Sequence, residues 1–233
     1  MKRRLSLAAA LLACTCAMAQ QPPSRTFAPG PFDRLVVAGA ARIELTQGER
    51  DQVTIVGDEA VLKNVRLRHE NGRLVVTTED DWKFWNRETI QLRVTMHEIS
   101  RLSISGASDI IAKTPIRTAD LRIDISGQGE VRIPQLDARQ LRFNIAGAGD
   151  GELGGGQVED LQLNVSGKGK LVADKLKARN GVVNISGVGN ADVWVTDDLR
   201  VTVSGVGTVN YWGQPRLRQQ ISAIASVNAK GNK

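Results

Sequence analysis

Short runs in which apolar and polar residues alternate cover most of the chain. Leu121, Ile123 and Ile125 are one such run, with polar side chains between them, and similar runs recur further along. A period of two places one side of an extended strand against a core and the other in solvent. No stretch has a sustained helical period, so the pattern predicts an all-β fold.

A glycine motif, mostly Ser-Gly-x-Gly, follows these runs six times. The first glycines of successive motifs stand 21, 20, 20, 20 and 18 residues apart, and a second short strand begins after each motif. A fixed period of this length is typical of stacked structural units. We expect the motifs to be structural corners, and glycine would supply positive φ there. The corner glycines are Gly106, Gly127, Gly129, Gly147, Gly149, Gly167, Gly169, Gly187, Gly189, Gly205 and Gly207.

Two arrangements fit this repeat, an antiparallel meander and a parallel β-solenoid. When the repeats are aligned on their glycines, one outward column is mainly carboxylate or amide. Stacked amides about 4.8 Å apart can bond along a ladder, whereas a meander gives no reason for the column. We therefore predict a β-helix-like parallel solenoid of about six coils over residues 98–229. The column is Asp124, Asn144, Asn164, Asn184 and Thr202.

The segment 32–97 is less regular and is expected to be an N-terminal β block of the same domain. The dipeptide Asn71-Gly72 is a strong signal for a tight turn, and residues 65–69 are expected to form a strand. Since the ends of a solenoid are exposed sheet edges, this block could cap one end and residues 211–233 the other. Without such caps an edge-to-edge homodimer could form. Residues 230–233 are expected to be a tail.

The first residues have the features of an export signal. Three basic residues precede a short apolar run, and a small-x-small site predicts cleavage between Ala19 and Gln20. The signal peptide is thus residues 1–19, and the proline-rich residues 20–31 are expected to be a tether. Alternatively, Leu11-Leu12-Ala13-Cys14 resembles a lipobox, which would anchor a lipoprotein through Cys14. We expect a periplasmic or cell-surface location, and no later run is long enough to be a transmembrane segment.

Composition argues against several classes of function. The formal charge of +6 falls to about +3 without the three basic residues of the signal, so no nucleic-acid surface is indicated. Both cysteines lie within the signal segment, so a mature chain would have no thiol chemistry. The two histidines, His69 and His97, do not have the spacing of a zinc site, and the corner residues do not form an acidic calcium column. We expect no cofactor and no metal.

A column of arginines is the main candidate for ligand contact. Arg101, Arg122 and Arg142 align when the repeats are superimposed, and Arg200 joins them after two uncharged positions. A parallel stack would place the first three about 4.8 Å apart per coil. They could be splayed surface side chains partly paired with acids such as Asp124. They could also bind the anionic groups of a cell-envelope glycan or lipid headgroup.

Two tryptophans, Trp82 and Trp85, lie between charged residues in the N-terminal block. One interpretation is a hairpin tip whose aromatic rings cover the end of the core. The other is an exposed aromatic platform that contacts a sugar or a partner protein.

Four acidic residues support an alternative function. Many parallel β-helices act on polysaccharides with clustered carboxylates, and the candidates here are Asp124, Glu130, Asp150 and Glu152. General acid and base catalysis needs two carboxyls at a defined separation with different pKa values. The sequence alone does not position these four relative to one another.

The chain also resembles a known bacterial family. The resemblance lies in Phe32-Asp33-Arg34-Leu35-Val36-Val37, the Gln47-Gly48 turn, the glycine coils and the ending Tyr211-Trp212-Gly213-Gln214-Pro215. These are similar to the putative auto-transporter adhesin, head GIN domain family. The resemblance spans residues 32–227 and departs at Ser222-Ala223-Ile224-Ala225, where alanines replace corner glycines. It implies an exported β-helical protein with an adhesin-like role. Because the residues show no catalytic constellation, we expect a non-catalytic binding or structural module.

Overall fold

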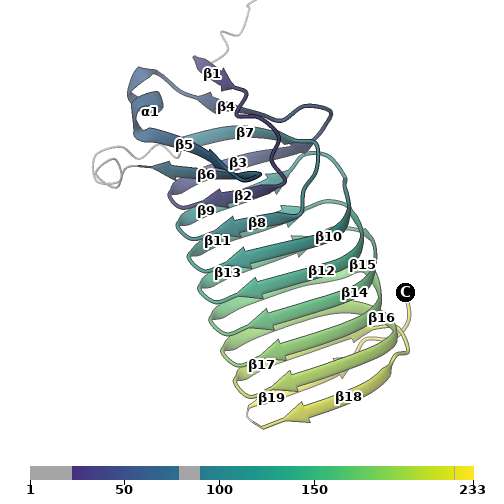
Figure 1. Ribbon diagram of the computed structural model, residues 1–233. Coiled ribbons are helices and arrows are strands. Elements are labelled where there is room, and N and C mark those ends of the chain that lie inside the picture. The colour runs from purple at the N-terminus through teal and green to yellow at the C-terminus, as the bar shows by residue number, and fades with distance from the viewer. Residues whose placement is uncertain (1–22, 79–89, 223) are drawn as a thin grey trace, which may run out of the picture.

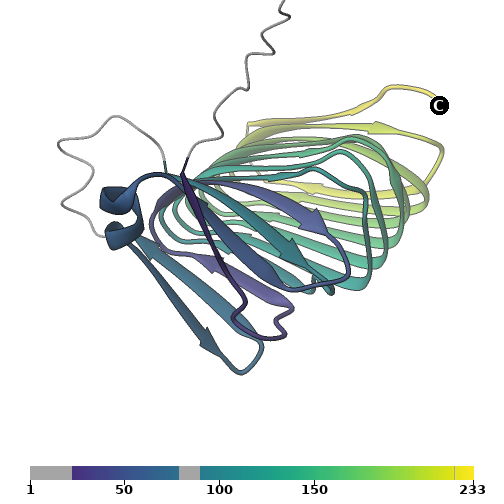
Figure 2. The same cartoon turned by 90° about the horizontal axis from the view of Figure 1, so that it is seen from above.

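The protein forms a regular stack of β coils, seen in a computed structural model that describes residues 23–78, 90–222 and 224–233. Successive coils lie one above another along a single axis (Figure 1). Figure 2 looks roughly along the stack and shows successive coils following similar outlines. Equivalent residues pair in parallel, as in Leu121 with Leu141 and Leu141 with Leu161. The predicted all-β parallel solenoid is confirmed.

Each coil contributes one strand to each of two stacked series, which we call the first face and the second face. The first face contains β2 (Arg34–Val37), β8 (Arg101–Ile104), β10 (Ile116–Ile125), β12 (Leu136–Ile145), β14 (Gly156–Val165), the later parts of β15 (Lys168–Ile185) and β16 (Val188–Val203), and β18 (Arg216–Ile221). The second face contains β3 (Ala40–Gln47), β9 (Ala107–Ala112), β11 (Gln128–Ile133), β13 (Ala148–Leu153), the early parts of β15 and β16, β17 (Val206–Trp212) and β19 (Ala225–Ala229).

The core lies between the two faces and is built from the alternating apolar residues. Leu121, Ile123 and Ile125 are buried, as the period-two pattern predicted. One coil differs, because Phe143 stands in β12 where neighbouring coils carry smaller aliphatic residues. Gly151 in β13 leaves room for this ring, since a Cβ at Gly151 would lie 2.6 Å from Phe143 Cζ. The large side chain and the missing one therefore compensate within one coil.

The predicted amide column forms a hydrogen-bonded ladder. Asn144 Nδ2 donates to Asp124 Oδ1 at 2.8 Å, and Asn164 Nδ2 donates to Asn144 Oδ1 at 2.8 Å. Asn184 Nδ2 continues the series to Asn164 Oδ1 at 2.9 Å. Every amide donates toward the earlier coil, so the ladder ends on the Asp124 carboxylate. A shorter ladder on the second face runs from Asn228 through Asn210 to Asp192.

The corner glycines are required for a reason that differs from the expected one. Of the eleven, only Gly129 has positive φ. The requirement is instead the close approach of successive corners: a Cβ at Gly127 would lie 2.1 Å from the oxygen of Gly106. At Gly147 it would lie 2.0 Å from the oxygen of Gly127. The motif is therefore fixed by contact between coils, and the positive-φ interpretation is wrong for ten of these positions.

The N-terminal block begins the solenoid and then covers its end. Its strands β2 and β3 pair in parallel with β8 and β9, so they already belong to the stack. The covering elements lie at the N-terminal end of the stack, at the top of Figure 1. They are β1 (Ser24–Phe27), β4 (Gln52–Val56), α1 (Glu59–Asn64) and β5 (Val65–Glu70), whereas β6 (Arg73–Thr78) and β7 (Ile90–Met96) pair in parallel with β2 and β3 and continue the stack.

Local signals explain how this block folds. Asp58 caps α1 by accepting bonds from the backbone of Ala60 and Val61, and Val61 is buried against the core. The predicted tight turn joins β5 to β6, with positive φ at Asn71 (49°) and Gly72 (71°). The expected strand over residues 65–69 is β5.

The proline-rich segment 20–31, expected to be a tether, contains a strand. Ser24–Phe27, within it, form β1, which pairs with β4 in antiparallel register from Ser24 opposite Val56 to Phe27 opposite Val53. Alternating donors and acceptors of β4 would otherwise remain at a sheet edge, and β1 satisfies them. The predicted signal peptide, with Cys14, Ala19 and Gln20, lies outside the described residues, as do Trp82 and Trp85.

The C-terminal end of the stack is open, which corrects the expected cap over residues 211–233. These residues include a further coil, in which β18 and β19 pair with β16 and β17 on one side only among the described strands. The short tail folds back, and Lys233 Nζ lies 2.6 Å from an Asp174 carboxylate oxygen. Exposed large aliphatic residues gather near this end: Val188, Val206, Ile221 and Ile224 are 52%, 47%, 39% and 81% exposed.

Candidate functional site

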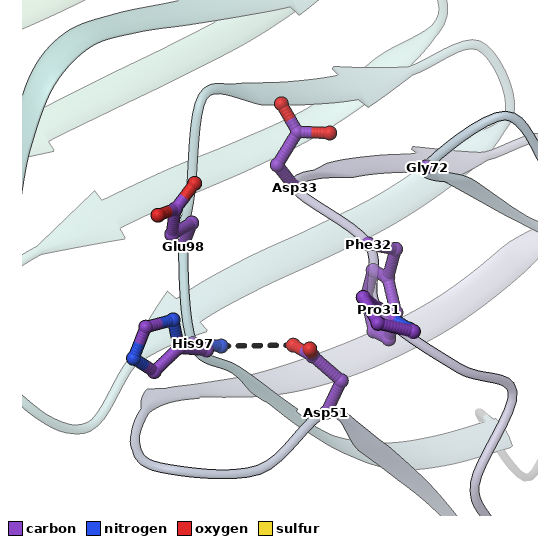
Figure 3. Close-up of a pocket in the computed structure, with 7 residues that line it drawn as sticks. All are labelled: Pro31, Phe32, Asp33, Asp51, Gly72, His97 and Glu98. Carbon is purple, nitrogen blue, oxygen red and sulfur yellow. Dashed lines mark hydrogen bonds between the residues drawn. The ribbon is translucent and has the colours of Figure 1, made fainter.

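One candidate is a pocket of about 350 Å³ near the N-terminal end, shown in Figure 3. Two of its acids already have partners: Asp51 accepts from the His97 backbone N–H at 2.8 Å, and Asp33 accepts from Ser100 Oγ at 2.5 Å. The imidazole of His97 points away from the Asp33 and Glu98 carboxylates in Figure 3. No pair of groups in it converges as general acid and base catalysis requires.

The four carboxylates of the polysaccharide-active alternative do not form one cluster. Asp124 lies on β10 of the first face, whereas Glu130, Asp150 and Glu152 lie on β11 and β13 of the second. Arg132 lies 2.7 Å from a Glu130 carboxylate oxygen and 3.0 Å from one of Glu152. Asp150 accepts from the Lys170 backbone N–H at 2.8 Å. These acids hold neighbouring coils together.

Asp124 also lacks the electrostatics of a general acid. Burial alone would raise its pKa, but hydrogen bonds from Arg122 and Asn144 and the charge of Arg101 outweigh that effect. The pKa of Asp124 is therefore held below its ordinary value, so the carboxyl is ionised at neutral pH. A glycosidase-type acid needs a raised pKa instead.

The arginines form a longer row than the sequence alone predicted. Register places Arg34 beside Arg101, and Arg73 beside Arg34, so the row continues into the N-terminal block. At the other end Arg200 lies beside Arg218. All these side chains point outward from the first face and from β6, which continues it. We call the row the arginine strip: Arg73, Arg34, Arg101, Arg122, Arg142, Arg200 and Arg218.

The arginines near the N-terminal end of the strip have acidic partners. Asp124 Oδ2 lies 2.7 Å from Arg101 Nη2 and 2.9 Å from Arg122 Nε, so one carboxylate serves two guanidinium groups. Arg34 Nε lies 3.4 Å from Asp33, and Arg73 Nη2 lies 3.9 Å from Glu70. Two of the three predicted contact arginines are thus partly neutralised by Asp124.

The remaining three arginines differ in this respect. Arg142, Arg200 and Arg218 are exposed and form no ion pair within the described part of the chain. Between Arg142 and Arg200 the row is interrupted by Gln162 and Val182, which occupy the same register position. The positive charge available to a ligand is therefore concentrated at two places.

Residues 23–78, 90–222 and 224–233 contain no group of three or more His, Cys, Asp or Glu side chains that could hold a metal ion. Within the same ranges, none of the helical segments has the length and apolarity needed to cross a bilayer.

A family comparison matches residues 31–215 to the family described as putative auto-transporter adhesin, head GIN domain. The chain belongs to this family. The match covers both the first coil, β2 with β3, and nearly all of the later coils, so the recognised unit is the solenoid together with its N-terminal cover. No curated protein matches the chain.

Solved structures show the same fold. A putative adhesin from Bacteroides fragilis is 21% identical with a TM-score of 0.85, over 89% of this chain and 96% of that one. A putative adhesin from Parabacteroides merdae is 17% identical with a TM-score of 0.69, over 89% and 95%. A protein from Parabacteroides distasonis, named a putative lipid binding protein, is 22% identical with a TM-score of 0.65, over 91% and 97%.

Sequence reasoning missed Arg34 and Arg73 because they lie outside the regular spacing, and it missed Arg218 because no corner glycine follows it in the last coil. A signal was nevertheless present, since most arginines of the strip directly precede an apolar core residue. Arg34-Leu35 and Arg73-Leu74 repeat the pattern of Arg101-Leu102. An outward arginine beside an inward leucine is the alternation expected of one strand position.

Proposed function

We propose that this protein is a non-catalytic binding module of the bacterial cell envelope whose arginine strip contacts an anionic glycan or lipid headgroup. The observation that carries the proposal is the in-register row of seven outward arginines. Neighbouring strands are about 4.8 Å apart, so like charges repel unless the side chains splay or an anion lies between them. Guanidinium groups bind phosphates and carboxylates through two parallel hydrogen bonds, which suits this role.

The adhesin-like family supports an extracytoplasmic location for the module. Export through the predicted signal peptide, residues 1–19, would release the protein into the periplasm or onto the cell surface. Processing at Cys14 would instead anchor it as a lipoprotein. Mass spectrometry of the N-terminus of the secreted or membrane-bound protein distinguishes Gln20 from a lipidated Cys14.

Structural relatives named as putative adhesins, and one named as a putative lipid binding protein, support a binding role of this kind. Both names are compatible with a surface that meets charged groups of the envelope. A rigid solenoid would present the strip without a large change in its own structure, so little ordering free energy would be lost on binding.

Binding of purified protein to lipopolysaccharide and to an acidic polysaccharide tests the proposal, with a neutral polysaccharide as the control. We expect binding that weakens as salt is raised, because exposed charges are screened. Combined Arg122→Ala and Arg142→Ala substitutions should weaken it further. Binding that is unchanged by these substitutions and by high salt would contradict the role of the strip.

A further inference from the structure

A second basic site lies on the first face near the open end of the stack. It is a shallow pocket of about 330 Å³, and it is the place where the strip resumes after its uncharged interruption. Val182 replaces arginine at this register position, and its shorter side chain leaves space beside Arg200. The lining residues are Asn180, Gly181, Val182, Asp198, Leu199, Arg200, Arg216 and Arg218.

The charges in this pocket are unbalanced in favour of an anion. Arg216 Nη2 lies 2.6 Å from an Asp198 carboxylate oxygen, so this acid is already engaged. Arg200 and Arg218 are neighbours in the register and form no ion pair within the described ranges. Asn180 donates its side-chain amide to Asp160, and Asp160 does not line the pocket. Two guanidinium groups therefore remain for one phosphate or carboxylate group.

Arg142 provides the other available charge on the same line. Three coil steps separate it from Arg200, through Gln162 and Val182, which is about 14 Å at the usual strand spacing. A single headgroup or free anion can fill only one of these positions. A linear polymer lying along the stack can place separate anionic groups at both.

We propose that the strip is a two-point site for a linear acidic polysaccharide, which lies parallel to the solenoid axis. One anionic group binds at Arg142, and another binds in the pocket between Arg200 and Arg218. The uncharged Gln162 and Val182 face the sugars between these groups. This inference rests on the proposed function of the strip and adds the class of polymer, its direction and the spacing of its charges.

Hyaluronan fragments of defined length, with one carboxylate per disaccharide, test the inference by calorimetry or biolayer interferometry. A fragment too short to reach both points is compared with one several repeats long, at equal carboxylate concentration. Because the second contact becomes intramolecular, the long fragment should bind at least about 10-fold more tightly per molecule. Arg200→Ala with Arg218→Ala should remove this gain, so that the long and short fragments bind this variant with similar affinity.

Lys168→Ala with Lys175→Ala is the matched control, because it also removes two positive charges but from outside the strip. This variant should retain the length dependence. Circular dichroism and thermal unfolding of all variants establish that each is folded. Equal affinity for the short and long fragments, or a length dependence that survives the Arg200 and Arg218 substitutions, would overturn the two-point site.

Three further results separate the inference from the function on which it rests. Failure of wild-type protein to bind any anionic glycan or vesicles of anionic phospholipid would remove the proposed function itself. Binding to lipopolysaccharide that needs only one of the two points would keep that function and reject the polymer site. Stronger binding to anionic vesicles than to long glycan, unaffected by Arg142→Ala, would also reject it.

Discussion

Single side chains decide how well each coil closes, and Phe143 with Gly151 is the clearest case. The ring of Phe143 fills the space that a side chain at Gly151 would need, since the two positions belong to one coil and face each other. Neighbouring coils divide the same space differently, with Val131 or Leu171 at the position of Gly151. In this coil the Phe143 ring therefore occupies the place of the side chain that Val131 or Leu171 supplies in its neighbours.

Gly151→Val should therefore destabilise the protein by about 1–3 kcal/mol, because the added methyl groups overlap the Phe143 ring. The double variant with Phe143→Leu should recover most of this loss. Urea unfolding of the two single variants and the double variant measures the coupling. Additive losses in the double variant would show that the two side chains do not share one space.

The Asp124 carboxylate makes a different contribution, which depends on pH. Its pKa is lowered in the folded state, so its stabilisation is present above the ordinary aspartate pKa of about 3.9 and is lost as the pH falls through the lowered value. Asp124→Asn keeps an oxygen that can accept from Asn144 but removes the charge. The variant should be less stable than wild type at pH 7, and the difference should shrink toward pH 2.

Unfolding curves across this pH range test the expectation, with the exposed Glu159→Gln as a control for removal of an unrelated carboxylate.

The Asp124→Asn substitution also releases Arg101 and Arg122 from their shared acidic partner. Asp124→Asn should accordingly bind anionic polysaccharide more tightly than wild type at pH 7. Weaker binding would mean that Asp124 positions the arginines for the ligand.

At the scale of the element, contact between successive corners sets the sequence of the turn. The oxygen of one corner lies where a Cβ of the next would be, so a side chain cannot enter without separating two coils. The amide ladder acts alongside, because its bonds hold the same coils in register. A buried or half-buried bond of this kind contributes about 1 kcal/mol.

Gly147→Ala should lower the free energy of unfolding by about 1–3 kcal/mol, since its Cβ would lie 2.0 Å from the oxygen of Gly127. Gly155→Ala is the matched control. Its Cβ would lie 3.8 Å from the nearest atom, the oxygen of Pro134, and its φ is not positive. Similar effects of the two substitutions on denaturant unfolding would exclude coil contact as the cause.

Much of the regular stack could be predicted because each coil repeats the same physical requirements. The column of Asp124 and Asn144 predicted parallel stacking, and the alternation of Leu121 with its neighbours predicted the core. The pairing of Arg34 with Arg101 could not be read from spacing, since a long insertion separates their strands. The pocket at Arg200 was equally hidden, because it depends on a short Val182 side chain and on which acids are already engaged.

The whole molecule is asymmetric along its axis. One end is covered by α1 and by antiparallel strands, whereas β18 and β19 leave backbone groups and aliphatic side chains exposed at the other. An exposed edge of this kind is a template for pairing with another strand. The open end is therefore where contact between two copies of the chain is expected.

Sedimentation velocity over a range of protein concentrations should show a dimer at high concentration. Ile221→Lys with Ile224→Lys should shift the protein to monomer, because the added charges would face each other across the paired edges. Lysine at the exposed Val188 alone is the control that leaves both edge strands unchanged. A monomer at every concentration would show that the exposed edge is not used for self-association.

Equal spacing between coils also bears on how the chain could have arisen. Since each coil contacts mainly its two neighbours, an in-frame duplication of about twenty codons adds one layer without disturbing the others. A duplicated layer fits only if it brings its own corner glycines and ladder asparagine. A layer inserted between Arg142 and Arg200 would move these two basic clusters apart by one strand spacing, so duplication there could alter ligand preference while the fold persists.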